Sequence, residues 1–328
     1  MPCVLAGDIG GTQTRLALCE DPLRPLIHRT VQSRAHAGLD EIAAAFLNEA
    51  RSAGHPAPSA AAFGVAGPVL AGSARVTNLP WVLDERVLSK SLGIPRVRLL
   101  NDLEATGWGL GLLDETRDLV TILPGAPGAE GNRAILAAGT GLGEAGLIRE
   151  GDGHRPFATE GGHAGFAPGS EREIEILKFL SREFGPVSWE RVLSGPGLHN
   201  IFRALVAVSG GVEPEWIRTP EARTDPARAI TDAALAGASA VASEAIDLFV
   251  TFYGAEAGNV ALKFLATGGV YLAGGIAPRI RGRLRGPLFV RGFLEKGPMR
   301  PLLEAIPVRI VLREETALLG AARAALAG

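Results

Sequence analysis

One pattern occurs twice in this chain and restricts its fold more than any other feature. It is a short apolar strand, a turn rich in glycine and threonine, and a second apolar strand. Residues 4–18 read VLAGDIGGTQTRLAL and residues 135–149 read ILAAGTGLGEAGLIR. A glycine-rich turn between two apolar runs is typical of a β-hairpin. We therefore expect the same supersecondary unit to open each of two α/β halves.

Strand-like and helix-like segments alternate through the rest of the chain. Apolar, small and β-branched residues predict strands at 60–67, 96–102 and 270–276. Helical spacing or alanine-rich composition predicts helices at 41–53, 170–184, 235–252 and 315–326. This alternation favours an α/β architecture.

Composition limits the class of protein. The 328 residues suggest roughly two domains, and a hydrophobic content of 47% supports a substantial core. A formal net charge of −2 gives no overall attraction to nucleic acid or to an acidic membrane surface. The chain has only two cysteines, and its longest apolar region, 245–276, is interrupted by charged residues. The first predicted strand leaves no space for a signal peptide, so we expect a cytoplasmic protein.

The first turn has two interpretations. Gly10 and Gly11 allow unusual backbone angles and close approach of a ligand, and successive N–H groups in such a turn form an anion-binding nest. Thr12 adds a hydroxyl donor, and an acid such as Asp8 beside phosphates makes sense if a metal ion lies between them. Alternatively, Asp8 caps a tight hairpin. The hairpin alone does not decide between these readings.

Common nucleotide-binding motifs are excluded. Residues 141–146 spell GxGxxG, but a strand-like segment follows where the dinucleotide fingerprint needs a helix. No GxxxxGK[ST] occurs, no lysine lies in a glycine-rich turn, and the catalytic loop of protein kinases is missing. Two facing Gly/Thr turns would instead hold the phosphates of a nucleotide, with backbone donors and Mg²⁺ neutralising charge. Later glycines, at 268–269 and 274–275, would let an adenosine lie against the backbone.

Three further segments carry polar side chains suited to chemistry. Asn101 and Asp102 end the predicted strand at 96–102, where catalytic groups of α/β folds collect, although on this stretch alone an Asx turn or helix N-cap is the simpler explanation. Glu160 and His163 flank two glycines; no cysteine pair lies nearby, so hydrogen bonding to a polyhydroxy ligand suits them better than zinc. Glu190 is either a further acceptor or an ordinary surface glutamate.

Seven motifs in order resemble those of the bacterial glucokinases, ATP:glucose phosphotransferases of the actin-like/hexokinase superfamily. They are GDIGGT (7–12), TNLPW (77–81), ND (101–102), AGTGLG (138–143), EGGHAGFAP (160–168), ERVLSGPGL (190–198) and AGGIAPR (273–279). The resemblance spans essentially the whole chain. The related repressor/kinase group carries a zinc-binding cysteine cluster after its EGGH-like motif. This chain has no cysteine after Cys19, so that zinc site is not expected.

The resemblance implies a role for each motif. Asp102 is expected to be the general base on the glucose 6-hydroxyl, with Asn101, Glu160, His163 and Glu190 binding the other hydroxyls. Asp8 is expected to lie near Mg²⁺ and to contact it through water. The expected ATP-binding residues are Gly7, Asp8, Ile9, Gly10, Gly11, Thr12, Gly139, Thr140, Gly141, Gly274 and Gly275.

The resemblance also implies the domain organisation and partners. It predicts two actin-like, ribonuclease H-like α/β domains with a cleft between them: a small one at 1–112, to which 304–328 returns, and a large one at 113–303. D-glucose and ATP are the expected ligands, a homodimer the expected assembly, and the entry step of glycolysis the expected reaction. Other phosphoryl donors (polyphosphate or ADP), other hexoses, and a sugar-sensing regulator without turnover remain as alternatives. The absence of a basic charge balance disfavours a DNA-binding regulator.

Overall fold

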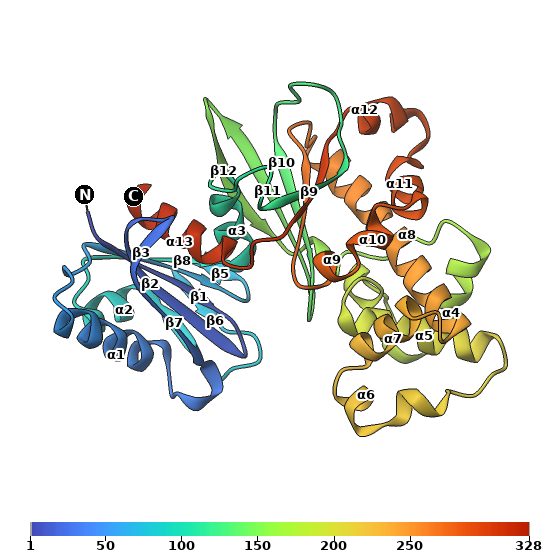
Figure 1. The fold of residues 1–328 in the computed structure, drawn as a ribbon, viewed down its shortest axis with the longest axis horizontal. Helices are drawn as coiled ribbons and strands as arrows, with labels where there is room; N and C mark the ends of the chain where they lie inside the picture. The colour runs from blue at the N-terminus through green and yellow to red at the C-terminus, as the bar shows by residue number, and fades with distance from the viewer. Residues whose placement is uncertain (1, 328) are drawn as a thin grey trace. The chain divides into compact units, whose positions relative to one another are not determined.

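The computed structural model describes residues 2–327, which form two compact units (Figure 1). The first unit contains Met1–Asp118, Leu147–Ala158 and Arg313–Gly328, and the second contains Leu119–Gly146 and Thr159–Leu312. The chain thus passes between the units more than once. The domain bounds expected from the resemblance stay a prediction.

A five-stranded mixed sheet forms the centre of the first unit, in the order β3-β2-β1-β4-β8. The predicted hairpin is confirmed: β1 (Val4–Ile9) pairs antiparallel with β2 (Gln13–Asp21), and β3 (Arg24–Gln32) continues the meander. β4 (Ala60–Val65) and β8 (Arg96–Asn101) then extend the sheet parallel to β1. Because these three strands run parallel, their carboxyl ends meet at one edge.

The alternation of side chains along these strands gives the sheet two apolar faces. Leu5, Ile9 and Leu16 pack with α1 (Leu39–Ser52) and α2 (Glu85–Leu92) on one face. Ala6 and Ala17 pack with α3 (Asp102–Leu110) and α13 (Thr316–Ala327) on the other (Figure 1). The small residues on this second face let two helices approach the sheet closely. The predicted helices at 41–53 and 315–326 are confirmed.

Both cysteines are buried as free thiols in this sheet. Cys3 immediately precedes β1, and Cys19 of β2 is the cross-strand partner of Val4. Burial raises the pKa of both thiols, that of Cys19 to about 12. They therefore remain protonated and pack as small apolar side chains.

Helices α3 and α13 cross with their backbones almost in contact, and glycines make the crossing possible. A Cβ on Gly320 would overlap the carbonyl oxygen of Ala105 and lie 2.6 Å from the amide nitrogen of Gly109. A Cβ on Gly109 would likewise overlap the carbonyl oxygen of Thr316. The shortened distance between the helices depends on these missing side chains.

We expect Gly320→Ala to destabilise the protein by about 1–3 kcal/mol, since the added methyl forces the helices apart. Gly282→Ala is the matched control, because Gly282 lies in α10 (Arg281–Leu284) and a Cβ there meets no atom within 4 Å. Alanine favours helix over glycine, so the control should be neutral or more stable by up to about 1 kcal/mol. Urea unfolding measures both. Equal midpoints for the two variants would show that the crossing tolerates a side chain.

The second sheet repeats the order of the first: β12-β11-β10-β13-β14-β9 corresponds to β3-β2-β1-β4-β8 with one strand added. Its hairpin strands are β10 (Arg133–Ala138) and β11 (Leu142–Glu150), followed by β12 (Gly153–Thr159). β13 (Val270–Ala273) and β14 (Val308–Val311) run parallel, and β9 (Leu119–Leu123) is antiparallel to β14. A small separate sheet contains β5 (Val69–Leu70), β6 (Ser73–Arg75) and β7 (Val82–Asp84). The sequence repeat is therefore a repeat of structure.

Helices enclose one large core in the second unit, which includes side chains from β10, β13 and β14. The remaining helices are α4 (Glu171–Phe184), α5 (Gly195–Val208), α6 (Pro220–Thr224), α7 (Pro226–Leu235), α8 (Ala240–Lys263), α9 (Ile276–Arg279), α11 (Pro287–Leu294) and α12 (Arg300–Glu304). Short 3₁₀ turns are η1 (Ser33–Ala35), η2 (Gly161–His163), η3 (Trp189–Arg191), η4 (Glu215–Arg218) and η5 (Gly297–Met299).

Two predicted bounds were wrong. The helix expected at 235–252 is α8, which begins at Ala240 and continues to Lys263. Gly237, with a φ of +66°, ends the preceding helix region, and the Ser239 side chain caps α8 by accepting from Ala242 N. The strand expected at 270–276 ends at Ala273, since Ile276 already starts α9.

No single helix within residues 2–327 is both long and apolar enough to cross a membrane. The pair α7 and α8 passes such a test only when the two are taken together, across a 105° bend.

Candidate active site

The first turn is held tightly by its own backbone and by one serine. The amide of Gly10 donates to the carbonyl oxygen of Gln13 at 3.0 Å, and Ser33 donates from its hydroxyl to Gly10 O (2.8 Å) and from its amide to Thr12 O (2.9 Å). Gly11 lies against Thr77, whose carbonyl oxygen would be 2.9 Å from a Cβ there. The exposed Thr12 lies at the tip of this fixed turn.

Asp8 lies on β1 directly opposite Arg15 of β2, and the two side chains form an ion pair at 3.4 Å. Burial raises the pKa of Asp8, and the charge of Arg15 partly offsets this effect. Within residues 2–327, no cluster of three or more His, Cys, Asp or Glu side chains could hold a metal by itself. Magnesium commonly binds one or two carboxylates together with waters and substrate phosphates, so a single aspartate beside the first turn is compatible with that ion.

Asn101 and Asp102 lie where β8 becomes α3. The Asn101 side-chain oxygen caps α3 by accepting from Leu103 N (2.9 Å) and Glu104 N (3.4 Å), and its amide donates to Gly67 O. Asp102 is the first helical residue, and one of its oxygens also accepts from Leu103 N. The N-cap explanation predicted from the sequence is therefore confirmed for Asn101, whereas Asp102 is not the capping residue.

The strand register brings Asp8 and the Asn101–Asp102 pair to the same edge of the first sheet. Asp8 aligns with Gly64 of β4, and Gly64 aligns with Leu100 of β8. Gly64 has no room for a side chain: a Cβ would be 2.8 Å from the Cβ of Ala105 and 3.8 Å from both Gly7 O and Asp102 Cα. The glycine thus lets α3 start close beside the first turn.

The second turn, Gly139–Gly141, joins β10 to β11. The amide of Gly139 donates to Gly141 O at 2.9 Å, and Gly139 O accepts from Gly195 N at 2.8 Å. Leu142 N, immediately after the turn, donates to Oε2 of Glu190 at 3.0 Å. Thr140 is exposed at the tip, as Thr12 is in the first turn. The GxGxxG match at 141–146 begins here, and strand β11 runs through it and beyond, so the helix that a dinucleotide fingerprint needs is replaced by a strand.

Gly274 and Gly275 lie beside the base of this second turn. Gly274 has a φ of +81°, and a Cβ on it would be 2.5 Å from Ala138 O. The buried hydroxyl of Tyr253, from α8, lies 3.4 Å from each of Ala138 N, Leu136 O and Ala273 O. The Tyr253 hydroxyl therefore contacts the residue just before Gly139–Gly141 and the residue just before Gly274–Gly275.

Glu160 and His163 lie at the two ends of η2, with exposed side chains. Among residues 2–327, no hydrogen bond or ion pair occupies either side chain. The glycines between them allow η2 to lie directly on β11: a Cβ on Gly162 would overlap Leu142 O, and one on Gly161 would overlap the Glu144 carboxylate. Replacing either glycine would displace the two polar side chains.

Backbone and aromatic contacts join η2 to η3, which carries Glu190. Trp189 N donates to Ala164 O at 2.9 Å, and Phe166 N donates to Val187 O at 2.9 Å. The rings of Phe166 and Trp189 meet edge to face with centroids 5.0 Å apart. After η3, Ser194 caps α5 by accepting from Gly197 N at 3.0 Å. The EGGHAGFAP and ERVLSGPGL motifs therefore form one structural element.

The structure thus places the predicted residues in two groups. The first unit contains the turn Gly7–Thr12, Asn101 and Asp102; the second contains Glu160, His163, Glu190, Gly139–Gly141 and Gly274–Gly275. Their roles toward ligands stay predictions. Sequence reasoning missed Ser33, Glu144 and Tyr253. A polar residue within an apolar strand or helix was the available signal for Glu144 and Tyr253.

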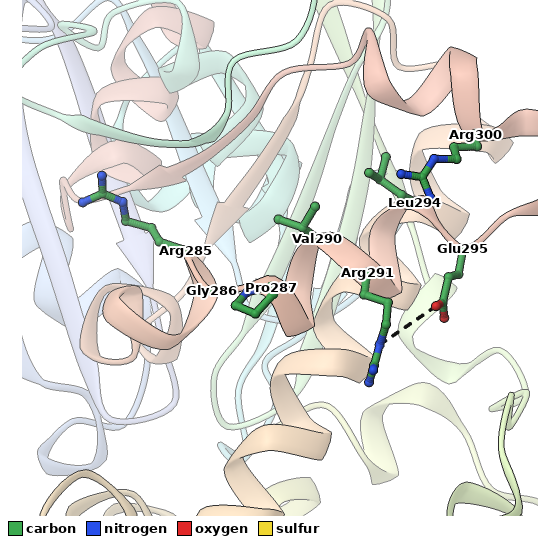
Figure 2. A pocket seen from close by; sticks show the side chains of 8 residues that line it. All are labelled: Arg285, Gly286, Pro287, Val290, Arg291, Leu294, Glu295 and Arg300. Carbon is green, nitrogen blue, oxygen red and sulfur yellow. Dashed lines mark ion pairs between the residues drawn. The ribbon is translucent and has the colours of Figure 1, made fainter.

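A cavity of about 370 Å³ lies elsewhere in the second unit, along α11 (Figure 2). It is lined by Arg285, Gly286, Pro287, Val290, Arg291, Leu294, Glu295 and Arg300. None of the predicted site residues lies there. Arg291 pairs with Glu295 and Arg300 with Glu304, which removes most of the positive charge that an anionic ligand would need.

Comparison with known proteins agrees with this geometry. The family model described as "Glucokinase" matches residues 5–327. A glucokinase of Nostoc sp. is 41% identical over 339 residues, covering 98% of each chain. The crystal structure of a glucokinase from an Antarctic psychrotroph has a TM-score of 0.86 and 30% identity, covering 100% of both chains. A ROK family glucokinase from Streptomyces griseus, solved in complex with glucose and AMPPNP, has a TM-score of 0.65 at 22% identity, with 99% of this chain and 100% of that one covered.

These relatives confirm the predicted actin-like α/β fold. With the family model matched across almost the whole chain and the paired strand–turn–strand hairpins in place, this protein belongs to the glucokinase family.

Proposed function

We propose that the protein transfers the γ-phosphoryl group of Mg-ATP to the 6-hydroxyl of D-glucose, with Asp102 as the general base. The observation that carries this proposal is the link between the sugar-binding candidates and the second turn. Glu190 accepts a hydrogen bond from the residue that follows Gly139–Gly141, and η3 is joined to η2, which positions Glu160 and His163. The proposed hydroxyl acceptors and the turn Gly139–Gly141 are therefore joined by direct hydrogen bonds.

Glucose would be held by side chains that accept and donate hydrogen bonds. Glu160, His163 and Glu190 would bind the hydroxyls at the C1 to C3 end of the ring, and Asn101 those at C3 and C4. Glu160 and His163 are exposed and carry no intramolecular hydrogen bond or ion pair within residues 2–327, which supports a role in ligand binding. A sugar with one misplaced hydroxyl would leave such groups unpaired, at about 1–3 kcal/mol each.

Phosphoryl transfer needs a base and a cradle for phosphate charge. Asp102 would take the proton of the 6-hydroxyl as O6 bonds to the γ-phosphorus and the bond to the bridging oxygen of ADP breaks. The main-chain N–H groups of Gly7–Thr12 and Gly139–Gly141 would hold the phosphates, and the open backbone at Gly274–Gly275 would accept the adenosine. Asp8 would hold Mg²⁺, which supplies charge neutralisation to the phosphates when bound.

The finer expectations from family resemblance are part of this proposal. They are a cytoplasmic location, a homodimer and the entry step of glycolysis. Polyphosphate or ADP as donor, or another hexose as acceptor, would use the same site, so a coupled assay with each donor and a hexose panel separates these alternatives. A glucose-binding regulator would bind the sugar without turnover.

Replacing Glu160 with glutamine tests the sugar site directly. We expect the KM for glucose to rise about 10–100-fold, because a hydrogen bond to a charged group is worth about 1.5–3 kcal/mol. The KM for ATP should stay unchanged. Glu171→Gln is the matched control, since Glu171 is exposed at the start of α4 in the same unit. A Glu160→Gln enzyme with the parent KM for glucose would remove Glu160 from the site.

A further inference from the structure

A chain of hydrogen-bonded polar groups links a buried glutamate of α8 to two lysines, of which Lys263 is exposed and Lys296 is half-buried. Glu256 of α8 is 0% exposed, and its oxygens accept from Asn259 Nδ2 at 2.7 Å and from Lys263 Nζ at 3.4 Å. Asn259 Oδ1 accepts in turn from Lys296 Nζ at 2.7 Å. Each oxygen of Glu256 therefore has a donor from its own helix, and Asn259 connects it to a second lysine.

Glu144 of β11 faces this chain from the other side and is 1% exposed. Among residues 2–327, its Oε1 has no hydrogen-bond partner. Its carboxyl group packs directly beneath Gly161, where a side chain would overlap Oε2 and lie 2.8 Å from Cδ. Thr159, just before η2, donates from its hydroxyl to Glu144 O at 3.0 Å and accepts from Gly161 N at 3.2 Å. Glu144 thus contacts the turn that carries Glu160 and His163.

The charges around Glu144 favour its neutral form. Burial, the nearby Glu256 carboxylate and a side-chain hydrogen bond to it together raise the pKa of Glu144 to about 8, although the charge of Lys263 opposes the rise. Both lysines contact other members of the chain, Lys263 the Glu256 carboxylate and Lys296 the Asn259 side chain. Losing the proton would place a second buried negative charge beside Glu256 and against the Gly161 backbone, which costs free energy.

We propose that Glu144, in its protonated form, is a positioning residue that holds η2 in the geometry required for glucose, and that loss of its proton displaces the turn and weakens glucose binding. The inference rests on the proposed function, because it takes Glu160 and His163 as ligands of the sugar. The groups that face Glu144 are Glu256 and Lys263 from α8, the Thr159 hydroxyl and the backbone of η2; Lys296 acts through Asn259, and Glu160 and His163 flank the turn.

Calorimetric titration of glucose between pH 6.5 and 9.5 tests the proposal without any phosphoryl donor. In the parent protein we expect the Kd to be flat near pH 7 and to rise at least 5-fold above about pH 8, the range in which Glu144 ionises. Glu144→Gln keeps the shape and cannot ionise, so its Kd should match the parent at pH 7 within about 3-fold and stay flat at high pH. Glu150→Gln is the matched control on the same strand, because Glu150 is exposed and should leave the parent profile unchanged.

Glu256→Gln gives a second, independent measure. Removing that charge lowers the pKa of Glu144, so the rise in Kd should move to lower pH. A flat parent profile, or an unchanged rise in Glu144→Gln, would overturn the inference and leave the proposed function intact. If Glu144→Gln does not fold, an unshifted profile in Glu256→Gln overturns it. Absence of glucose binding at every pH would overturn both proposals.

Discussion

Replacing Asp102 with asparagine is expected to lower kcat for glucose phosphorylation by about 10²–10⁴-fold, the usual contribution of a general base. Asparagine keeps the size and one acceptor oxygen but cannot take the proton of the 6-hydroxyl. Glucose should still bind, since Asn101, Glu160, His163 and Glu190 are untouched. Steady-state kinetics with a coupled assay measures kcat, and calorimetry measures glucose binding on the same preparation.

The structure separates the catalytic role of Asp102 from a role in capping α3. Asn101, rather than Asp102, is the N-cap of α3, so the substitution leaves the cap in place. Glu104→Gln is the matched control: it removes one charge from the same first turn of α3, where Glu104 pairs with Arg98 at 2.9 Å. It should keep kcat within a few-fold. A folded Asp102→Asn enzyme with near-parent turnover would exclude Asp102 as the base.

The second large effect is expected for Asp8→Ala, which should reduce kcat with ATP by roughly 10²–10³-fold, as removal of one preorganised electrostatic group does. Glucose binding should survive, because no sugar ligand is proposed at that position. Kinetics at several magnesium concentrations, beside calorimetric glucose titration, measures both.

Arg15→Met separates this role from a purely structural one. It breaks the 3.4 Å ion pair between Arg15 and Asp8, together with the 3.6 Å pair between Arg15 and the exposed Glu314, and keeps the Asp8 carboxylate. If Asp8 serves only that pair, both variants should lose stability alike and keep the activity of the folded fraction. If Asp8 positions magnesium, only Asp8→Ala should lose turnover. Equal turnover in the two variants would contradict the magnesium role.

Much of the fold follows from local sequence signals. The hairpins at Gly10–Gly11 and Gly139–Gly141 were predictable because a short glycine-containing segment between two apolar runs is a strong signal for a β-hairpin. The order of the family motifs along the chain supported the same prediction. Local pattern therefore identified the turns and the candidate ligands close to them in sequence.

The bounds of α8 show where local pattern fails. Alanine-rich sequence continues across the break at residues 236–239, so hydrophobic spacing alone placed the helix start too early. Gly237 and Ser239 were the usable stop and start signals. At the other end, Glu256 and Lys263 looked like interruptions of an apolar run. They instead lie on one helix and bond to each other at 3.4 Å.

Contacts between distant residues could not be predicted from one sequence. Tyr253 supports Ala138 from 115 residues away, and Glu190 accepts from Leu142 across 48 residues. Neither partner carries a local signal for the other. The turns could therefore be predicted from the sequence, but the contacts that Tyr253 and Glu190 make beside them could be identified only from the structure.

The two buried thiols described above also provide a built-in probe for the unfolding of the first unit. Thiolate is the reactive form of cysteine, and Cys3 and Cys19 are both shielded and held protonated in the first sheet. The chain has no other cysteine, so a thiol reagent can modify it only when that sheet opens. The rate at which intact mass increases under native conditions therefore reports the opening of the first unit alone, and saturation with either substrate would reveal which ligand keeps that unit closed.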